Sequence, residues 1–468
     1  MGMTRANAAD WKAQPAGAED ACRVGEASAK YKAAASGYLP FGLKQTEVGI
    51  IPNDWEVKSM GAIGSLSKGR GLLKEDIRPN GSVPAVPYTA LYTDFSEVLD
   101  YKRIKWFVDE TEGTVVVDEP CVLIASSSNM AENTGKASAP PGHMPIAVGR
   151  EVIIFRSGDS ATFISYLLST ASYRKRTLAL ARGTTIKHLY PATFADYKLG
   201  LPALREQRVI AEALSDVDGL LEDLDALIAK KRAIRQAAMQ QLLTGKTRLP
   251  GFSGEWKTKR LGDHVTFLRS GTNSRADLIV EGRIKYLHYG DIHTSPHIQL
   301  NPSIDQMPCL PAERAASLDR LRDGDIVFAD ASEDIEGVGR SVEILGATGH
   351  EVVPGLHTIA ARFDKSVLVD GYKAFLQFCP AFRSHLRRLA AGTKVYATNR
   401  AHIASAEIPL PSPPEQQGIA RVLHEMDGEI AALELRHEKT RAIKQGMMQQ
   451  LLTGRIRLVP SSTAGPPT

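Results

Sequence analysis

Two stretches of the chain carry hydrophobic residues at the spacing of one buried helix face. The first runs from Pro202 to Arg248, and its hydrophobic positions lie three or four residues apart, as in a helix packed against another helix. Pro202 suits the start of a helix and Gly245 suits its end. Roughly 40 residues predict a rod of about 60 Å, which is too polar to cross a membrane. The predicted seam consists of Ile210, Leu214, Val217, Leu221, Leu224 and Ile228.

The same pattern recurs 209 positions later, between Leu410 and Arg457. Both copies contain Met-Gln-Gln-Leu-Leu-Thr-Gly, at residues 239–245 and 448–454, so polar positions are repeated as well as hydrophobic ones. Two unrelated amphipathic helices would share the period but not this sequence. We therefore interpret the stretches as two copies of one element. The second predicted seam consists of Ile419, Leu423, Met426, Ile430 and Leu433.

The segment before each long helix is also repeated. Ile51–Gly61, which contains Trp55, has a counterpart in Gly251–Gly262, which contains Trp256. The repeated unit is therefore a whole domain followed by its helix. The expected organisation is an extension at 1–40, a first domain at 41–200, a central helix at 201–248, a second domain at 249–409, a distal helix at 410–458 and a tail at 459–468.

Within each domain, the pattern indicates short strands and turns with one late helix. Compact hydrophobic runs predict buried strands at Cys121–Ser126 and Asp325–Asp330. The late helices are expected from Phe163 in the first copy and from Tyr372 in the second. The fold class is therefore α+β, with two domains in a tandem pseudo-twofold repeat separated by two long antiparallel coiled-coil helices.

Composition adds little beyond a size class. The 468 residues are 43% hydrophobic and 24% charged, which excludes a disordered or fibrous protein. A net charge of +4 permits a polyanionic partner without requiring one. The four cysteines are scattered and form no CxxC motif, so we expect neither a zinc site nor disulfides, and a cytoplasmic location.

Basic residues gather near the end of each domain. An alternative explanation is that these cations only complement helix dipoles, but one or two residues would serve that purpose. Clusters in both copies favour contact with a nucleic-acid backbone. The predicted phosphate contacts are Arg174, Arg176, Arg182 and Lys187 in the first copy, and Arg383, Arg387, Arg388 and Lys394 in the second.

Motifs for catalysis or metal binding fail on inspection. Thr244–Thr247 resembles the end of a P-loop, but the required earlier glycine is Gln240 and the helix lies on the wrong side. Asp54 and Glu56 resemble part of a nuclease carboxylate set, but the second copy has no matching acids. His188 and His357 are interpreted as structural or base-contacting. We therefore expect no catalytic residues and no metal site.

The ordered set of repeated motifs resembles the DNA specificity subunit of type I restriction–modification systems. The resemblance rests on Leu201-Pro202 with Glu206-Gln207, on Pro411 with Glu415-Gln416, and on the two Gln-Gln-Leu-Leu-Thr-Gly helix ends. It implies two target recognition domains that each read one half of a split double-stranded DNA sequence. It also implies that the helices dock methyltransferase subunits, which carry S-adenosylmethionine. Motor and nuclease subunits would join that core and use ATP and magnesium, so this chain itself would need no cofactor.

Base reading is expected from the loops that differ between the copies. Guanidinium and amide groups suit guanine and adenine edges, and a carboxylate suits cytosine. An exposed turn residue without a DNA contact is the alternative at each position. The candidates are Lys68, Arg70, Ser126, Asn129 and Lys136 in the first copy, and Arg269, Ser270, Thr272, Asp330 and Arg340 in the second.

Two alternatives to a non-catalytic DNA-reading subunit stay open at this point. One is a stand-alone enzyme that acts on DNA through an unrecognised active site. The other is an interaction scaffold whose coiled coil is its whole function.

Overall fold

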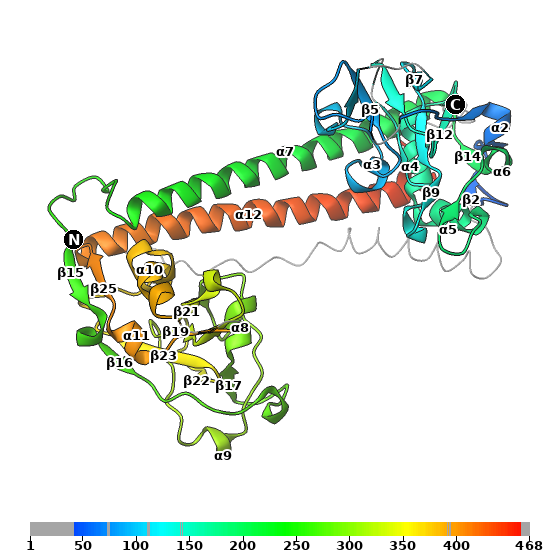
Figure 1. Cartoon of the computed structure of the whole chain (residues 1–468). Coiled ribbons are helices and arrows are strands. Elements are labelled where there is room, and N and C mark those ends of the chain that lie inside the picture. Colours follow the sequence, from blue (N-terminus) through cyan, green and yellow to red (C-terminus); the bar gives the residue numbers. More distant parts are fainter. Residues whose placement is uncertain are drawn as a thin grey trace, which may run out of the picture. The chain divides into compact units, whose positions relative to one another are not determined.

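The computed structural model describes residues 42–72, 75–109, 113–140, 142, 144–390, 392 and 395–459 (Figure 1). The predicted extension at 1–40, nearly all of the predicted tail and the candidate Lys394 lie outside these residues.

The chain forms two compact units, and each unit includes parts of two long helices. Unit 1 consists of residues up to Glu222 and from Glu438 onward, and unit 2 consists of Asp223–His437. The long helices are α7 (Leu204–Leu242) and α12 (Pro413–Leu451), each of 39 residues. Both fall within the segments in which the hydrophobic period predicted them. The domain boundaries drawn from the sequence stay a prediction.

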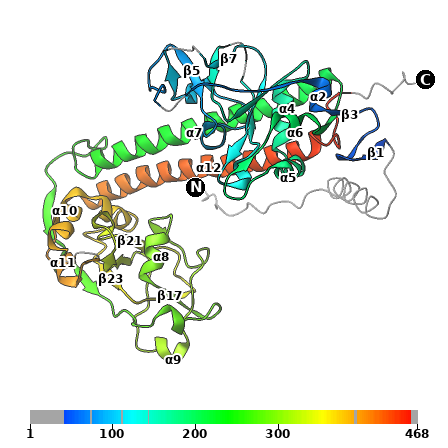
Figure 2. The ribbon, with the colours of Figure 1, turned by 45° about the vertical axis from the view of Figure 1, so that its right-hand side comes forward.

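The two long helices run antiparallel within each unit, as Figures 1 and 2 show. In unit 2, Lys231 of α7 pairs with Glu429 of α12 at 2.6 Å, and Asp225 of α7 pairs with His437 of α12 at 3.3 Å. An earlier residue of α7 therefore meets a later residue of α12, as in antiparallel helices. In unit 1, Lys444 pairs with Asp218 at 2.7 Å. The predicted pair of long antiparallel helices is therefore confirmed.

Unit 1 is built on a four-stranded antiparallel sheet with the order β10-β8-β12-β4. A second sheet, β6-β5-β11-β7, joins β11 to β5 in parallel. The bounds are β4 Gly64–Lys68, β5 Val83–Val86, β6 Phe107–Val108, β7 Val115–Val117, β8 Val122–Ala125, β10 Ala137–Ser138, β11 Ile146–Val148 and β12 Val152–Ser157.

Short elements complete unit 1. A hairpin runs into the repeated segment, and the strand after Trp55 pairs with the strand that leads into α7. These elements are β1 Leu43–Thr46, β2 Gly49–Pro52, β3 Glu56–Ser59, α2 Met60–Ile63, α3 Ala90–Thr93, η1 Tyr101–Arg103, β9 Ser127–Ser128, η2 Ala131–Asn133, α4 Ala161–Ser169, α5 Ala171–Leu180, β13 Lys187–His188, α6 Pro191–Ala195 and β14 Lys198–Leu201.

Unit 2 is built on a five-stranded sheet with the order β16-β23-β19-β21-β18, and a parallel pair, β17 with β22, accompanies it. The strand after Trp256, β15, pairs with β25, which leads into α12. The strands are β15 Lys257–Arg260, β16 Val265–Phe267, β17 Ile284–Leu287, β18 Gln299–Leu300, β19 Ile326–Ala329, β20 Ala331–Ser332, β21 Ser341–Ile344, β22 Glu351–Pro354, β23 Thr358–Phe363, β24 Tyr396–Ala397 and β25 Glu407–Leu410. The helices are η3 Leu261–His264, η4 Arg275–Asp277, α8 Tyr289–Thr294, α9 Ala312–Ala315, η5 Ile335–Gly337, η6 Lys373–Phe378, α10 Pro380–Leu389 and α11 Arg400–Ala404.

The main sheets of the two units share one strand order: β10-β8-β12-β4 in unit 1 corresponds to β21-β19-β23-β16 in unit 2, where β18 is an additional edge strand. In unit 1, β8 lies between β12 and β10, and β10 follows the 3-10 helix η2. In unit 2, β19 lies between β23 and β21, and β21 follows the 3-10 helix η5. Both central strands are the buried runs predicted from the sequence, and all four residues of each are buried. The tandem repeat inferred from motifs is therefore a repeat of topology.

The predicted late helices differ between the copies. The first is an α-helix, α4, whose Ser160 side chain accepts a hydrogen bond from the Phe163 N–H. The second begins as a 3-10 helix, η6, before α10 starts at Pro380. Just before and within this segment, the N–H groups of Gly371 and Ala374 donate hydrogen bonds to the carboxylate of Glu343 at 2.8 and 3.1 Å. The first copy is also divided, because α4 ends at Ser169 and α5 begins at Ala171. The prediction of one late helix is therefore only partly right in both copies.

Candidate nucleic-acid interface

Each unit has an arginine after the end of one long helix that binds a glutamate at the start of the other. In unit 1, Arg457 donates to both carboxylate oxygens of Glu206 at 2.5 and 2.7 Å, and also binds Asp54 at 2.9 and 2.8 Å. Glu206 is 2% exposed, so this carboxylate depends on its partner. Hydrogen bonds from Arg457 lower the pKa of Asp54. Asp54 is thus a structural acid and not part of a metal site.

Unit 2 repeats this contact with Arg248 and Glu415. Arg248 donates to the two carboxylate oxygens at 2.5 and 2.7 Å, and Glu415 is 1% exposed. Here the indole N–H of Trp256 adds a third donor at 3.3 Å. The glutamate of each repeated Glu-Gln motif therefore connects the start of one long helix to the end of the other.

The glutamine of the same motif fixes the helix to the domain body. Gln207 donates to Asp159 at 2.7 Å and accepts from the N–H of Ser160 at 3.0 Å. Gln416 donates to the Val367 carbonyl at 2.7 Å and accepts from the Val369 N–H at 3.1 Å. The motifs that carry the family resemblance thus build the frame of each unit.

The glycine of each Leu-Leu-Thr-Gly end has a backbone that favours glycine and lies against the repeated tryptophan. Gly245 and Gly454 have φ values of +68° and +67°. A Cβ atom at Gly245 would lie 3.3 Å from the ring of Trp256, and one at Gly454 would lie 3.1 Å from the ring of Trp55. Thr244–Thr247 is therefore a helix exit, in agreement with the rejection of a P-loop.

The first predicted base-reading residues fall on the surface of unit 1, with one exception. Arg70 and Asn129 are exposed, and Lys68 and Lys136 are half-buried. Ser126 is fully buried, and its hydroxyl donates to the carboxylate of Glu151 at 3.1 Å. Ser126 is therefore withdrawn as a direct base contact, because its side chain is oriented toward Glu151 inside the fold.

The candidates in unit 2 lie around the end of β19. Arg269 and Thr272 are exposed, and Ser270 donates to the Thr358 carbonyl at 3.0 Å. Arg340 donates to the carbonyls of Ile292 and Ser295, at 3.2 and 2.9 Å. The Oδ1 atom of Asp330 lies 3.1 Å from Nδ1 of His357. These positions stay proposals for DNA contact.

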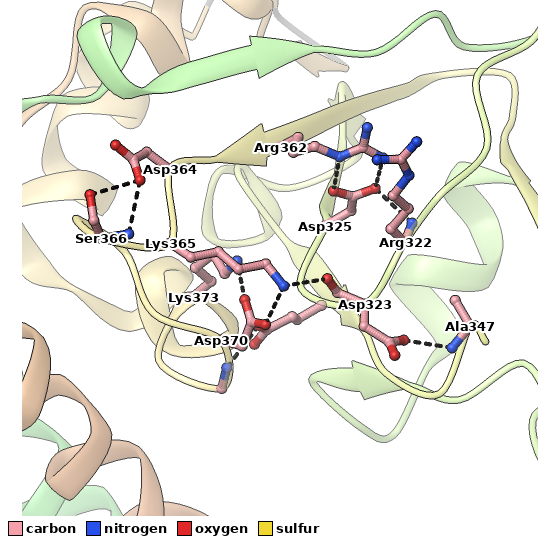
Figure 3. Close-up of polar contacts among 12 residues, drawn as sticks. Arg322, Asp323, Asp325, Ala347, Arg362, Asp364, Lys365, Ser366, Asp370 and Lys373 are labelled. Carbon is pink, nitrogen blue, oxygen red and sulfur yellow. Dashed lines mark hydrogen bonds and ion pairs between the residues drawn. The ribbon is translucent and has the colours of Figure 1, made fainter.

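A set of polar contacts lies near the other end of β19, as Figure 3 shows. Asp325, which is 2% exposed, binds Arg362 of β23 at 2.8 and 2.6 Å and accepts from the Arg322 N–H at 2.8 Å. Asp370 binds the ammonium groups of Lys365 and Lys373, each at 2.7 Å. The start of the strand that ends before Asp330 is therefore joined to β23 through Asp325 and Arg362.

The predicted phosphate contacts in unit 1 divide into two groups. Arg176 stacks on Tyr173 and Tyr197, with its guanidinium carbon 4.8 and 4.6 Å from the ring centres, and donates to the Lys198 carbonyl. Arg174 donates to the Glu132 carbonyl at 2.5 Å, and burial lowers its pKa. Both are withdrawn as primary phosphate contacts because their guanidinium groups pack into the fold. Arg182 is exposed and Lys187 is half-buried, so these two remain candidates.

In unit 2 the basic cluster lies on α10. Arg383 donates to Glu336 at 2.8 Å, and Arg387 binds the same carboxylate. Arg388 is exposed, and its guanidinium lies 3.4 Å from the imidazole of His385. Glu336 is 67% exposed, so these ion pairs are surface pairs that a phosphate could displace.

Burial of the predicted seam residues is graded. Seven are buried and four are half-buried. Ile210 and Leu214 belong to a core that also contains Leu451 and Leu452 of the other helix. Their role in docking partner subunits stays a prediction. The buried set is Ile210, Leu214, Leu224, Ile228, Ile419, Leu423 and Ile430, and the half-buried set is Val217, Leu221, Met426 and Leu433.

Glu151 is a functional candidate that the sequence reasoning missed. It is the residue immediately before β12, and its carboxylate lies among Lys68, Ser126 and His188. Its counterpart in unit 2 is His357, for which the sequence predicts only a structural or base-contacting role. The signal that could have found both is their common place just before the matching strands Val152–Ser157 and Thr358–Phe363.

Among the described residues, no group of three or more His, Cys, Asp or Glu side chains could hold a metal ion. In the same part of the chain, no helix is long and apolar enough to span a membrane.

Comparison with known proteins gives a consistent match. Residues 52–230 match the family model of the type I restriction modification DNA specificity domain. The chain is 23% identical over 448 residues to the putative type I restriction enzyme MjaX specificity subunit of Methanocaldococcus jannaschii, covering 90% of this chain and 98% of that protein. It is 22% identical over 439 residues to the type I restriction enzyme EcoKI specificity subunit of Escherichia coli, covering 87% and 90%.

A solved structure supports the fold. The type-I restriction-modification system S subunit from M. genitalium aligns with a TM-score of 0.54 at 16% identity, covering 88% of this chain and 98% of that one. The chain is therefore a tandem-repeat α+β protein, in which each of two similar units includes parts of two long antiparallel helices. Residues 52–230 match the type I restriction modification DNA specificity domain, and over most of its length the chain is similar to specificity subunits of type I restriction enzymes.

Proposed function

We propose that this chain is the sequence-specific DNA-binding specificity subunit of a type I restriction–modification complex. Each unit reads one half of a bipartite double-stranded DNA target. The observation that carries the proposal is the whole-length repeat. The same motif set frames both units, and the alignment with a named specificity subunit covers 90% of the chain.

The rest of the chemistry is assigned to partners. Methyltransferase subunits bind S-adenosylmethionine and methylate adenine, and motor and nuclease subunits use ATP and magnesium. The chain itself is non-catalytic in this proposal and acts in the cytoplasm with these partners. The long helices supply the docking surface, and their length, rather than a flexible linker, sets the spacing of the half-sites.

The contacts with DNA divide by chemistry. Arg182, Lys187, Arg383, Arg387 and Arg388 are assigned to the phosphate backbone, where cations displace counterions without regard to sequence. The loop residues are assigned to base edges in the major groove. They are Lys68, Arg70, Asn129 and Lys136 in unit 1, and Arg269, Ser270, Thr272, Asp330 and Arg340 in unit 2.

The test is selection from a random duplex DNA library by the full-length chain assembled with its modification subunits. The expected product is a motif of two specific half-sites separated by a spacer of fixed length. Selection of no motif would contradict the proposal and favour the scaffold. The chain alone is also incubated with DNA, S-adenosylmethionine, ATP and magnesium. Turnover by the chain alone would favour a stand-alone enzyme.

A further inference from the structure

The two units place a small polar cluster at the same point of the fold. In unit 1, the N–H of Ser126, after the central strand, donates to the carbonyl of Glu151, before the last strand, at 2.9 Å. In unit 2, the N–H of Asp330 donates to the carbonyl of His357 at 3.1 Å. The carbonyls of Ser126 and Asp330 each accept a 2.7 Å hydrogen bond, from Leu189 and Thr398 respectively. The backbone frame is therefore the same.

In unit 1 the acid of this cluster comes from the position before the last strand. The Glu151 Oε2 atom accepts from the Ser126 hydroxyl at 3.1 Å and from the Lys68 ammonium at 3.5 Å. The Nδ1 atom of His188 lies 4.0 Å away. Glu151, Lys68 and His188 are 29%, 33% and 38% exposed, so the carboxylate and both basic groups reach the surface.

In unit 2 the acid comes from the position after the central strand. Asp330 occupies the place of Ser126, and its Oδ1 atom lies 3.1 Å from Nδ1 of His357, which occupies the place of Glu151. Asp330 is 31% exposed and His357 is 52% exposed. The order of acid and partner along the frame is thus reversed between the units.

The backbone of His357 is unusual. It is one of two residues other than glycine with positive φ among those described, at +56°, and it directs an exposed imidazole toward Asp330. The ring of Tyr289 lies 5.4 Å from the imidazole, nearly perpendicular to it. Half-exposed ion pairs contribute little to folding. Backbone strain at an exposed residue points to a requirement beyond stability.

We propose that this cluster is the base-reading site of each unit. This inference rests on the proposed function and names its contacts. The carboxylate of Glu151 or Asp330 accepts a hydrogen bond from the exocyclic amino group of cytosine or adenine in the major groove. The adjacent Lys68 ammonium in unit 1, or the His357 imidazole in unit 2, contacts the same base pair. Ser126 is a positioning residue for Glu151.

The reversed order has a consequence for specificity. In unit 1 the acid is Glu151, directly before β12, and in unit 2 it is Asp330, directly after β19. The two units therefore place their acceptor at different positions along the base edges. One scaffold reads two different half-sites by this exchange.

The experiment repeats the library selection with variants of the full-length chain in the same complex. Glu151→Gln and Asp330→Asn keep side-chain size and remove the charge. Each is expected to reduce the preference at one base pair of one half-site by about tenfold and to leave the other half-site unchanged. Glu47→Gln in unit 1 and Glu313→Gln in unit 2 change exposed acids that have no assigned DNA contact, and both should leave the motif intact.

A further variant guards against a folding defect. His357→Asn retains a residue that tolerates positive φ, and it should alter the same half-site as Asp330→Asn. Thermal melting confirms that each variant is folded. If all three variants select the wild-type motif, or bind it with uniformly lower affinity, this inference is overturned. The proposed function would still stand. A wild-type complex that selects no half-sites overturns both.

Discussion

The guanidinium of Arg457 holds the carboxylate of Glu206 through two parallel hydrogen bonds, although 251 positions separate the residues. The pair joins the segment after α12 to the first turn of α7, where a negative charge also complements the helix dipole. Arg248 and Glu415 make the same pair in unit 2. In each unit, the repeated sequence motifs therefore join the start of one long helix to the end of the other.

Breaking this pair should destabilise unit 1. Arg457→Ala leaves the buried Glu206 carboxylate without its partner, and we expect a loss of about 3 kcal/mol in the free energy of unfolding. Urea denaturation followed by circular dichroism measures it. Adding Glu206→Gln to Arg457→Ala removes the unpaired charge and should restore part of the loss. Equal stability of the wild type and Arg457→Ala would show that the pair is not needed.

A charge in the helix seam should prevent proper pairing of the helices. Ile430 is 8% exposed, so Ile430→Asp buries a carboxylate and should lower stability by about 3 kcal/mol or more. Leu221→Asp, at a half-buried position, should have a smaller effect. Thermal melting and size-exclusion chromatography with the modification subunits measure folding and assembly. The matched control is Ala432→Asp at an exposed position of α12, and similar losses in the control and Ile430→Asp would reject the seam assignment.

The basic residues of α10 should set affinity without setting sequence preference. Arg387→Ala combined with Arg388→Ala should weaken binding to every duplex and reduce the slope of log affinity against log salt by up to about two, which is near 0.9 per phosphate contact. Fluorescence anisotropy at several salt concentrations measures this slope.

Glu336 provides an opposite test of the same cluster. Its carboxylate binds Arg383 and Arg387, so Glu336→Gln frees both cations and should strengthen binding to non-specific DNA. Affinity and salt slope that stay at wild-type values in both this variant and the double arginine variant would remove the phosphate assignment of α10.

Stability should depend on the protonation of Glu343. Burial raises the pKa of this carboxyl from 4.5 to about 7, more than offsetting the two backbone N–H groups that favour the charged form. The folded state then binds the proton more tightly than the unfolded state. The resulting stabilisation is complete below pH 4.5 and is lost as the pH rises through about 7.

A non-titrating variant isolates this contribution. The difference in free energy of unfolding between the wild type and Glu343→Gln should change by about 3 kcal/mol between pH 4.5 and 8. Chemical denaturation across this range measures it, with Glu313→Gln, an exposed acid of α9, as the control. A constant difference across the range would mean that Glu343 titrates normally.

The long helices and the central strands could be predicted because their signals are local. The three-and-four spacing from Ile210 to Ile228 specifies a helix, and the hydrophobic runs ending at Ala125 and Ala329 specify buried strands. The repeat then gives the order of the elements twice. These features need no knowledge of which strands pair.

The candidate site was harder to predict because it depends on pairing between distant strands. Glu151 and Ser126 meet only because β12 and β8 pair in one register, and the sequence does not state that register. Arg176 reads as a surface cation, and only the fold places it over Tyr173 and Tyr197. Residue type and position along the chain identify candidate loops, while three-dimensional contacts separate surface groups from buried ones.

The most direct test of the account is a map of methylated adenines in the genome of cells that carry this chain, compared with cells from which it has been deleted. Deletion should abolish methylation at one motif made of two specific half-sites separated by a fixed spacer. An unchanged methylation pattern, or loss of methylation at a single continuous motif, would contradict it.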